Sequence, residues 1–215
     1  MPGITITVGP RDADIVGSDH LAIQAAVDFV SGIGGGTVRL LPGTYEMGNS
    51  VFVRSKITLT GAGDDTILRK PACAGTPLVD DTDWYDYTVK VRDPSIFRVG
   101  GGMLLRAKSP HYDKQQFVKS TVAAIEGNVI TLDRQPRENF WIDQDAEAVT
   151  LYPIITAEYR TDIAIDSLCI DGNREHNELS NLQLRSGNHG HHVAHMCRAC
   201  GSADIEAIPL AEAVQ

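Results

Sequence analysis

The chain has 215 residues, a formal net charge of −9, and 42% hydrophobic but only 6% aromatic residues. This length suits one domain, or one domain with an insertion, and the negative charge disfavours nucleic acid and anionic membranes as partners. With 20 Gly and 10 Pro, the composition favours a turn-rich β protein over a helical bundle. No stretch is apolar over the length needed to cross a bilayer.

The N-terminal residues do not resemble a signal peptide, because residues 1–12 lack its basic and long apolar parts. We therefore expect either a cytoplasmic chain or a secreted chain whose leader has been removed. The four cysteines predict no disulfide framework, since they are few for a chain of this length.

The first elements are predicted between residues 4 and 43. Residues 4–8 alternate between apolar and polar and predict a strand. A helix follows, capped by Ser18 or Asp19, with these apolar residues at helical spacing: Leu21, Ile23, Ala26, Val27 and Val30. The glycines at residues 32 and 34–36 end that helix, and residues 37–41 predict a second strand before a turn at Pro42-Gly43.

This order of elements resembles the N-terminal cap and first rung of the right-handed parallel β-helix proteins. The matching residues are Gly34, Gly35, Gly36, Thr37, Val38, Leu40, Pro42, Gly43, Thr44 and Tyr45. Residues 163–174 are similar to rungs of the pectate-lyase-like and polygalacturonase-related members. The superfamily also includes phage tailspikes, so a virion-associated protein is a third expectation for location. The resemblance covers residues 15–70 and 153–200.

The strand pattern divides the chain into three parts. Residues 1–70 form the cap and first coils, with strands predicted at 51–53, 57–60 and 66–68 and a turn at 61–65. Residues 71–152 break this rhythm and predict an inserted antiparallel subdomain, with strands at 88–91, 103–106, 117–125 and 129–132 and a hairpin turn at 126–128. Residues 153–215 resume the coils and end in a tail, with strands at 163–165, 168–170, 182–184, 193–196 and 205–208.

The predicted fold class is therefore all-β: a right-handed parallel β-helix with an N-terminal capping α-helix and an inserted small antiparallel β subdomain. The proteins that the chain resembles have many more coils than the few predicted here. An uncovered last coil would expose strand edges and an apolar interior. We expect the tail, further chain, or a second copy in a homo-oligomer to cover it.

A polar cluster between residues 171 and 200 contains most of the candidate site residues and most of the histidines. Hydrolysis of a glycosidic bond needs a carboxylic acid and a carboxylate on the two sides of the bond. We expect the catalytic residues to be Asp166, Asp171 and His189. The expected substrate-binding residues are Asn173, Arg174, His176, Arg185, Asn188 and His191. Asn188-His189-Gly190 partly matches a polygalacturonase motif, but that family's Asp-Asp pair and Arg-x-Lys are missing nearby.

Elimination at a uronate polymer is the alternative chemistry. It needs a cation to neutralise the uronate carboxylate and a base to remove a proton. Arg160, Arg174 and Arg185 are candidate cations, with Ca²⁺ possible as a cofactor, and His176, His189 and His191 are candidate bases. Hydrolysis requires no cofactor. We favour hydrolysis, because acidic groups outnumber basic ones and no carboxylate cage for Ca²⁺ stands out.

Two further hypotheses stay open. His191 and His195 are candidate Zn²⁺ ligands, although about 13 Å would separate them in a straight strand, so a bend would be needed. The second hypothesis is that the chain is a carbohydrate-binding or tailspike-like structural module without catalytic activity. In either case the expected partner is a polysaccharide or oligosaccharide, and no nucleic acid or membrane.

The inserted segment contains a second group of candidate sugar-binding residues. Trp84, Tyr85, Tyr87 and Trp141 have rings that can stack on sugars, and we expect half of them to pack in the core of the insertion instead.

Overall fold

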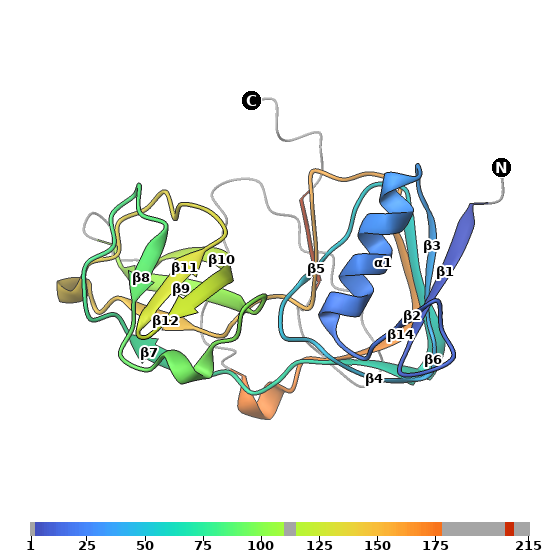
Figure 1. Ribbon diagram of the computed structural model, residues 1–215, viewed down its shortest axis with the longest axis horizontal. Coiled ribbons are helices and arrows are strands. Elements are labelled where there is room, and N and C mark those ends of the chain that lie inside the picture. Colours follow the sequence, from blue (N-terminus) through green and yellow to red (C-terminus); the bar gives the residue numbers. More distant parts are fainter. Residues whose placement is uncertain (1–2, 110–114, 178–204, 209–215) are drawn as a thin grey trace. The chain divides into compact units, whose positions relative to one another are not determined.

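The computed structural model describes residues 3–109, 115–177 and 205–208 (Figure 1). The chain divides into two compact units: Met1–Pro71 together with Pro153–Gln215, and Ala72–Tyr152. We call them unit 1 and unit 2 and describe each by itself. Both consist mainly of strands, and unit 1 contains a parallel sheet, so the expectation of a mostly β chain is confirmed. Within the described ranges, no helix has the length and apolar character needed to cross a membrane.

Unit 1 contains the predicted helix, α1 (His20–Gly32). Asp19 caps it, because the Asp19 Oδ1 atom accepts a hydrogen bond of 2.9 Å from the Ala22 amide. The apolar residues that α1 buries are Ile23, Ala26, Val27 and Val30. Leu21, the other apolar residue of the predicted pattern, is 54% exposed and lies outside this buried face. At about 100° per residue, position 21 lies nearly opposite position 23 on the helix.

The main sheet of unit 1 is parallel. It consists of β2 (Ile15–Val16), β1 (Ile4–Gly9), β3 (Gly36–Leu40), β6 (Ile57–Arg69) and β14 (Ala164–Asp171), in the spatial order β14-β6-β3-β1-β2, and β4 (Gly43–Glu46) also pairs with β6. The register aligns one inward row across four strands: Ile6, Val38, Leu59 and Ile165. A Cβ on Gly36 would collide with the Ile4 carbonyl oxygen, so β1 and β3 need glycine at this position.

β6 and β14 each consist of two arms. Residues 57–60 of β6 pair with β3, and residues 66–69 pair with β4. The strands predicted at 57–60 and 66–68 are therefore one bent strand, β6. Shifts in its pairing register with β14 occur where the turn at 61–65 was predicted. The second arms align another inward row: Tyr45, Leu68 and Ile170. Ser167, with φ of 53°, marks the bend in β14.

A third group of strands completes unit 1. β5 (Val51–Phe52), β13 (Ile155–Glu158) and β15 (Ile205–Ile208) pair in parallel, in the order β15-β13-β5. The sequence did not predict β13. The strands predicted at 182–184 and 193–196 lie outside the described residues. A short 3-10 helix, η3 (Arg174–His176), follows β14.

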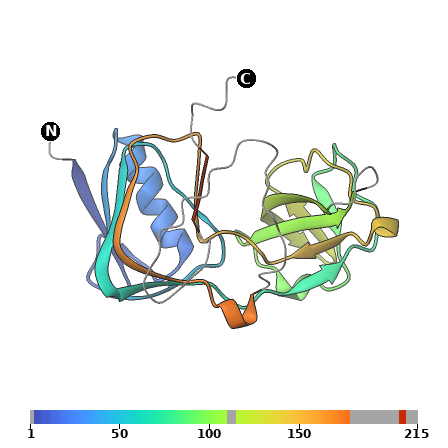
Figure 2. The same cartoon turned by 180° about the vertical axis from the view of Figure 1, so that it is seen from behind.

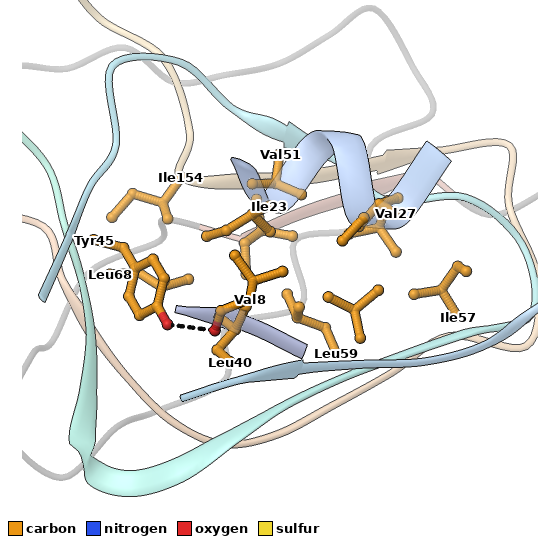
Figure 3. Packing of buried hydrophobic residues seen from close by; sticks show 14 of the residues in the cluster. Val8, Ile23, Val27, Leu40, Tyr45, Val51, Ile57, Leu59, Leu68 and Ile154 are labelled. Atoms are coloured by element: carbon orange, nitrogen blue, oxygen red, sulfur yellow. Dashed lines mark hydrogen bonds between the residues drawn. The ribbon is translucent and has the colours of Figure 1, made fainter. Parts of the chain in front are cut away.

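The core of unit 1 lies between α1 and the sheets. α1 packs against β1, β3 and β5, and Figure 3 shows Ile23 and Val27 pointing toward Val8 and Leu59. Tyr45 is buried in this core, where its hydroxyl oxygen lies 2.9 Å from the Val8 carbonyl oxygen and 2.8 Å from that of Leu41. Burial raises the pKa of Tyr45 to about 12, so the phenol keeps its proton and acts as a donor.

Unit 2 is a six-stranded antiparallel arrangement (Figures 1 and 2). Its strands are β7 (Gly75–Pro77), β8 (Thr88–Lys90), β9 (Gly102–Lys108), β10 (Gln115–Glu126), β11 (Val129–Leu132) and β12 (Glu147–Val149), in the order β7-β12-β9-β10-β11-β8. A Leu78–Val91 bridge joins the two outermost strands and closes the sheet into a barrel. Gly127 and Asn128 form the hairpin loop between β10 and β11, as predicted.

The barrel has its own apolar interior and two 3-10 helices, η1 (Pro94–Ile96) and η2 (Ile142–Gln144). Side chains from all around it form the core, among them Leu78, Val91, Met103, Leu105, Val122, Ile130 and Phe140. The sequence predicted four of the six strands but neither β7 nor β12, which are three residues long.

Replacement of Tyr45 by phenylalanine tests the polar contact in the core of unit 1. We expect Tyr45→Phe to lower the free energy of unfolding by about 1–2 kcal/mol, because two carbonyl oxygens near the core lose a donor. Urea denaturation measures this difference. Tyr159→Phe is the control, since Tyr159 is exposed and its change should stay within about 0.5 kcal/mol. Equal stabilities of the two variants would contradict the assigned role of Tyr45.

Candidate functional site

Two rows of polar residues follow the outer side of the main sheet. Side chains alternate between the faces of a strand, so the neighbours of the inward Leu59 and Ile165 point outward. The first row is Arg39, Thr60 and Asp166, and the second is Glu46, Arg69 and Asp171. Each row crosses three neighbouring strands. Both predicted catalytic aspartates therefore lie on the strand β14, at one end of a row.

Asp171 is held by two donors. The Arg69 Nε atom lies 2.9 Å from its Oδ2 atom, and the Asn173 amide donates to its Oδ1 atom over 2.9 Å. The Asn173 amide is the larger cause of a lowered pKa at Asp171, with Arg69 adding to it against a partial burial penalty. This environment keeps Asp171 ionised at neutral pH. An ionised carboxylate serves as a base, a nucleophile or a hydrogen-bond acceptor, and does not serve as a proton donor.

Asp166 has a separate partner on the neighbouring strand. The Thr60 hydroxyl donates to its Oδ1 atom over 2.5 Å. Ser167 bends β14 between the two aspartates, so Asp166 belongs to the first arm and Asp171 to the second. Among the described residues, no hydrogen bond or ion pair joins the two carboxylates. The structure thus places both on the same strand but gives each its own neighbour.

The turn after β14 brings three of the predicted substrate-binding residues together. Asn173 has left-handed backbone angles, and its Oδ1 atom lies 2.9 Å from the His176 Nδ1 atom. Arg174 and His176 both belong to η3 and are exposed. The hydrogen bond to Asn173 orients the imidazole ring, and Arg174 extends a guanidinium group from the same helical turn. Both groups required by the elimination hypothesis are thus present in one segment.

Asn177 ties this turn to Pro71 at the end of the N-terminal segment of unit 1. Its Nδ2 atom donates to the carbonyl oxygens of Pro71, over 3.0 Å, and of Asn173, over 3.1 Å. Its Oδ1 atom is buried and accepts no hydrogen bond from the described residues. The sequence placed Asn177 in the polar cluster without a role. Its place in that cluster was the only available signal, and this signal does not separate a positioning residue from a solvated one.

The remaining predicted site residues lie outside the described residues. They are Arg185, Asn188, His189, His191 and His195. The proposed roles of His189 in catalysis and of His191 and His195 in metal binding therefore stay predictions. Within the ranges that the structure describes, no group of three or more His, Cys, Asp or Glu side chains is placed to hold a metal ion.

Comparison with known proteins adds three distant structural likenesses. No model of a protein family matches the sequence, and no curated protein matches it. The tailspike gp61 of Pseudomonas phage phi297 is 13% identical, with a TM-score of 0.35, over 69% of this chain and 28% of that protein. The gp54 tailspike of Acinetobacter baumannii bacteriophage AP22, solved in complex with A. baumannii capsular saccharide, is 14% identical, with a TM-score of 0.35, over 70% of this chain and 31% of that protein.

The tailspike gp49 of Pseudomonas phage LKA1 is 15% identical, with a TM-score of 0.34, over 67% of this chain and 31% of that protein. This chain therefore spans less than a third of the length of each of the three tailspikes. At these identities and TM-scores, the likenesses support no inference about function.

The lowered pKa of Asp171 predicts a pH-dependent contribution to stability. A carboxyl group with a depressed pKa in the folded state stabilises the protein above its unfolded pKa of about 3.9, and this stabilisation is lost as the pH falls through the folded value. Asp171 is more than a third exposed, so we expect Asp171→Asn to cost no more than about 1 kcal/mol at neutral pH. The measurement is urea denaturation of both proteins at neutral pH and near pH 2. A difference that persists undiminished in acid would contradict the assignment.

Proposed function

We propose that unit 1 is a right-handed parallel β-helix capped by α1, that residues 71–152 are an insertion in it, and that the protein binds and cleaves a polysaccharide. The stacked rows in the main sheet support the fold. Val38, Leu59 and Ile165 occupy equivalent inward positions on strands separated by successive passes of the chain. A coil of this kind cannot bury its inner face alone, so each pass stabilises the next.

The principal support for the function is Asp171, an ionised carboxylate on the outside of a rigid strand. Arg69 and the Asn173 amide hold it in place, and Asn173, Arg174 and His176 follow directly in the chain. Carboxylate, amide, guanidinium and imidazole groups are the partners that sugar hydroxyls need. Strand ends and their loops on a rigid scaffold are also where binding groups concentrate.

Hydrolysis is the reaction that we favour. Asp171 is suited to activate water or to attack the anomeric carbon, because it stays ionised. The leaving oxygen needs a proton from a second group, and we propose Asp166 or His189 for that role. Asp166 lies on the same strand as Asp171, and the Thr60 hydroxyl donates to its Oδ1 atom and orients the carboxyl group.

Elimination is the second candidate, because Arg174 and His176 share η3. In this reaction Arg174 would neutralise a uronate carboxylate, and His176, oriented by Asn173, would remove the adjacent proton. The products separate the two reactions. Hydrolysis yields new reducing ends alone, whereas elimination also yields unsaturated uronates that absorb in the ultraviolet.

We expect Asp171→Asn to reduce polysaccharide cleavage by at least about 100-fold, because a positioned base contributes that much or more. The assay measures reducing ends and ultraviolet absorbance on a panel of neutral and uronic-acid polysaccharides. Asp28→Asn is the matched control, since Asp28 pairs with Arg54 over the same 2.9 Å and is similarly exposed, but lies on α1. We expect this control to cleave at the rate of the parent protein.

Three results would contradict the proposed hydrolysis. An Asp171→Asn variant with full activity would remove Asp171 from the chemistry. Absence of products across the panel, from folded protein that still binds a polysaccharide, would favour the non-catalytic module. Cleavage with ultraviolet-absorbing products that is lost in His176→Ala would instead support elimination.

A further inference from the structure

In the described part of unit 2, four large aromatic side chains are exposed, and they lie in two segments that hydrogen-bond to each other. Trp84 is 43% exposed, Tyr85 74% and Tyr87 53%, and Trp141 is 39% exposed. The expectation that half of these rings pack in the core of the insertion was wrong. Phe140 is buried instead and contributes to the barrel core with the apolar strand residues. The barrel is therefore filled without the four exposed rings. We call residues 80–87 together with Trp141 the aromatic platform.

The aromatic platform is held in shape by hydrogen bonds between residues 80–87 and the chain at 132–142. Thr82 and Phe140 form a two-way backbone bridge, with N–O distances of 3.0 and 2.9 Å. The Trp84 amide donates to the Asn139 side chain over 2.8 Å.

Two further contacts extend this attachment to the tyrosines. The Gln135 side chain donates to the Tyr85 carbonyl over 2.9 Å, and the Leu132 amide donates to the Tyr87 carbonyl over 2.7 Å. A segment fixed at so many points has already lost the conformational freedom that binding would otherwise remove.

Most carboxylates of the platform form an ion pair or a hydrogen bond that helps to hold its shape. Asp80 pairs with Lys90 over 2.6 Å, and this hydrogen-bonded contact lowers the pKa of Asp80. The Asp81 Oδ1 atom accepts from the Ile142 amide over 2.9 Å, and the Asp86 Oδ2 atom accepts from the Asp83 amide over 2.7 Å. These groups are engaged, but a carboxylate has about four lone-pair sites, so each can still accept a bond from a hydroxyl group.

Charge narrows the class of ligand. The platform combines aromatic rings with carboxylates, and the whole chain has a net charge of −9. A uronate polymer or another polyanion would be repelled. A basic peptide is less suited than a sugar, because Lys90 and backbone amides already bind three of the carboxylates. Neutral sugar rings suit the surface, since their C–H faces stack on aromatic rings and their hydroxyls donate to carboxylates.

A groove lies beside the platform in the same unit. It has a volume of about 590 Å³, within the range of ligand sites, and Val79, Arg92 and Ile142 are among the residues that line it. Ile142 directly follows Trp141 in the chain. Val79 likewise directly precedes the platform in the chain, and the lining also includes the carboxylates of Asp145 and Glu147.

We propose that the aromatic platform of unit 2 is a binding site for neutral oligosaccharides, separate from Asp171 and its neighbours. This site depends on unit 2 alone and would operate whether or not the chain cleaves a glycosidic bond. It adds affinity for a neutral glycan by ring stacking on a surface that is already in its bound shape.

The chain contains its own probe for this site, because its only two tryptophans are Trp84 and Trp141. Intrinsic tryptophan fluorescence of the full chain would be titrated with neutral oligosaccharides (cellohexaose, maltohexaose, xylohexaose and mannohexaose), with trigalacturonate and with hexalysine. We expect the emission to change with at least one neutral oligosaccharide and with neither charged probe. We also expect Asp171→Asn to leave this response unchanged, which separates the platform from the proposed cleavage site.

Tyr85→Ala tests the platform by substitution. Tyr85 is the most exposed of the four rings and both reporters remain, so we expect a folded protein with affinity reduced about tenfold, the equivalent of about 1.4 kcal/mol. Phe29→Ala is the matched control, since it removes an exposed aromatic ring from α1, and its affinity should equal that of the parent. Circular dichroism verifies folding of both variants.

Three outcomes would overturn the proposal. The first is no fluorescence response to any neutral oligosaccharide up to about 10 mM, a concentration that exceeds the Kd of even a weak complex. The second is a response to hexalysine alone, which would identify a site for basic peptides. The third is an equal loss of affinity in Tyr85→Ala and Phe29→Ala.

Discussion

The parallel pairing of β6 with its neighbours is the constraint on which unit 1 depends. A parallel strand has no hairpin partner of its own and needs strands from distant parts of the chain on its sides. β6 pairs with β3 and β4 on one side and with β14 on the other, and all three pairings keep apolar side chains in line. Leu59 and Leu68 of β6 are buried at the centre of the two inward rows. Loss of this register would expose both rows together, because a shift of one residue turns every side chain to the opposite face.

The same register also arranges the outer surface. Alignment of Leu59 with Ile165 brings Thr60 beside Asp166, and alignment of Leu68 with Ile170 brings Arg69 beside Asp171. The polar rows are thus a consequence of the apolar rows, and their side chains gain fixed positions at little cost in entropy. This relation gives Asp171 a defined environment although it is partly exposed, and supports a role in recognition of a ligand.

The sequence predicted elements with local signals and missed features that depend on distant contacts. The helix at residues 20–32 follows from its apolar period and from the Asp19 cap, and the β10–β11 hairpin follows from Gly127-Asn128. β7 (Gly-Thr-Pro) and β12 (Glu-Ala-Val) lack the alternation of polar and apolar residues seen in β8 (Thr-Val-Lys), which has the same length. Barrel closure through Leu78 and Val91 involves residues with no local signature. Asp166 and Asp171 lie on the two arms of β14, on either side of a bend at Ser167 that no local signal in the sequence marks. The exposed rings at Trp84 and Tyr85 show that aromatic residues in an insertion need not fill its core.

Charge links the two proposed sites and distinguishes the two candidate reactions. Elimination requires a uronate polymer, whose repeated carboxylates would approach a chain of net charge −9 and, in unit 2, a platform with several aspartates. Hydrolysis has no such requirement and accepts a neutral glycan. A neutral glycan suits each proposed surface taken by itself, with hydroxyls on the carboxylates of β14 in unit 1, or with ring faces on Trp84 and Tyr85 in unit 2. The net charge of the chain and the aspartates of unit 2 therefore favour a neutral substrate, and with it hydrolysis over elimination.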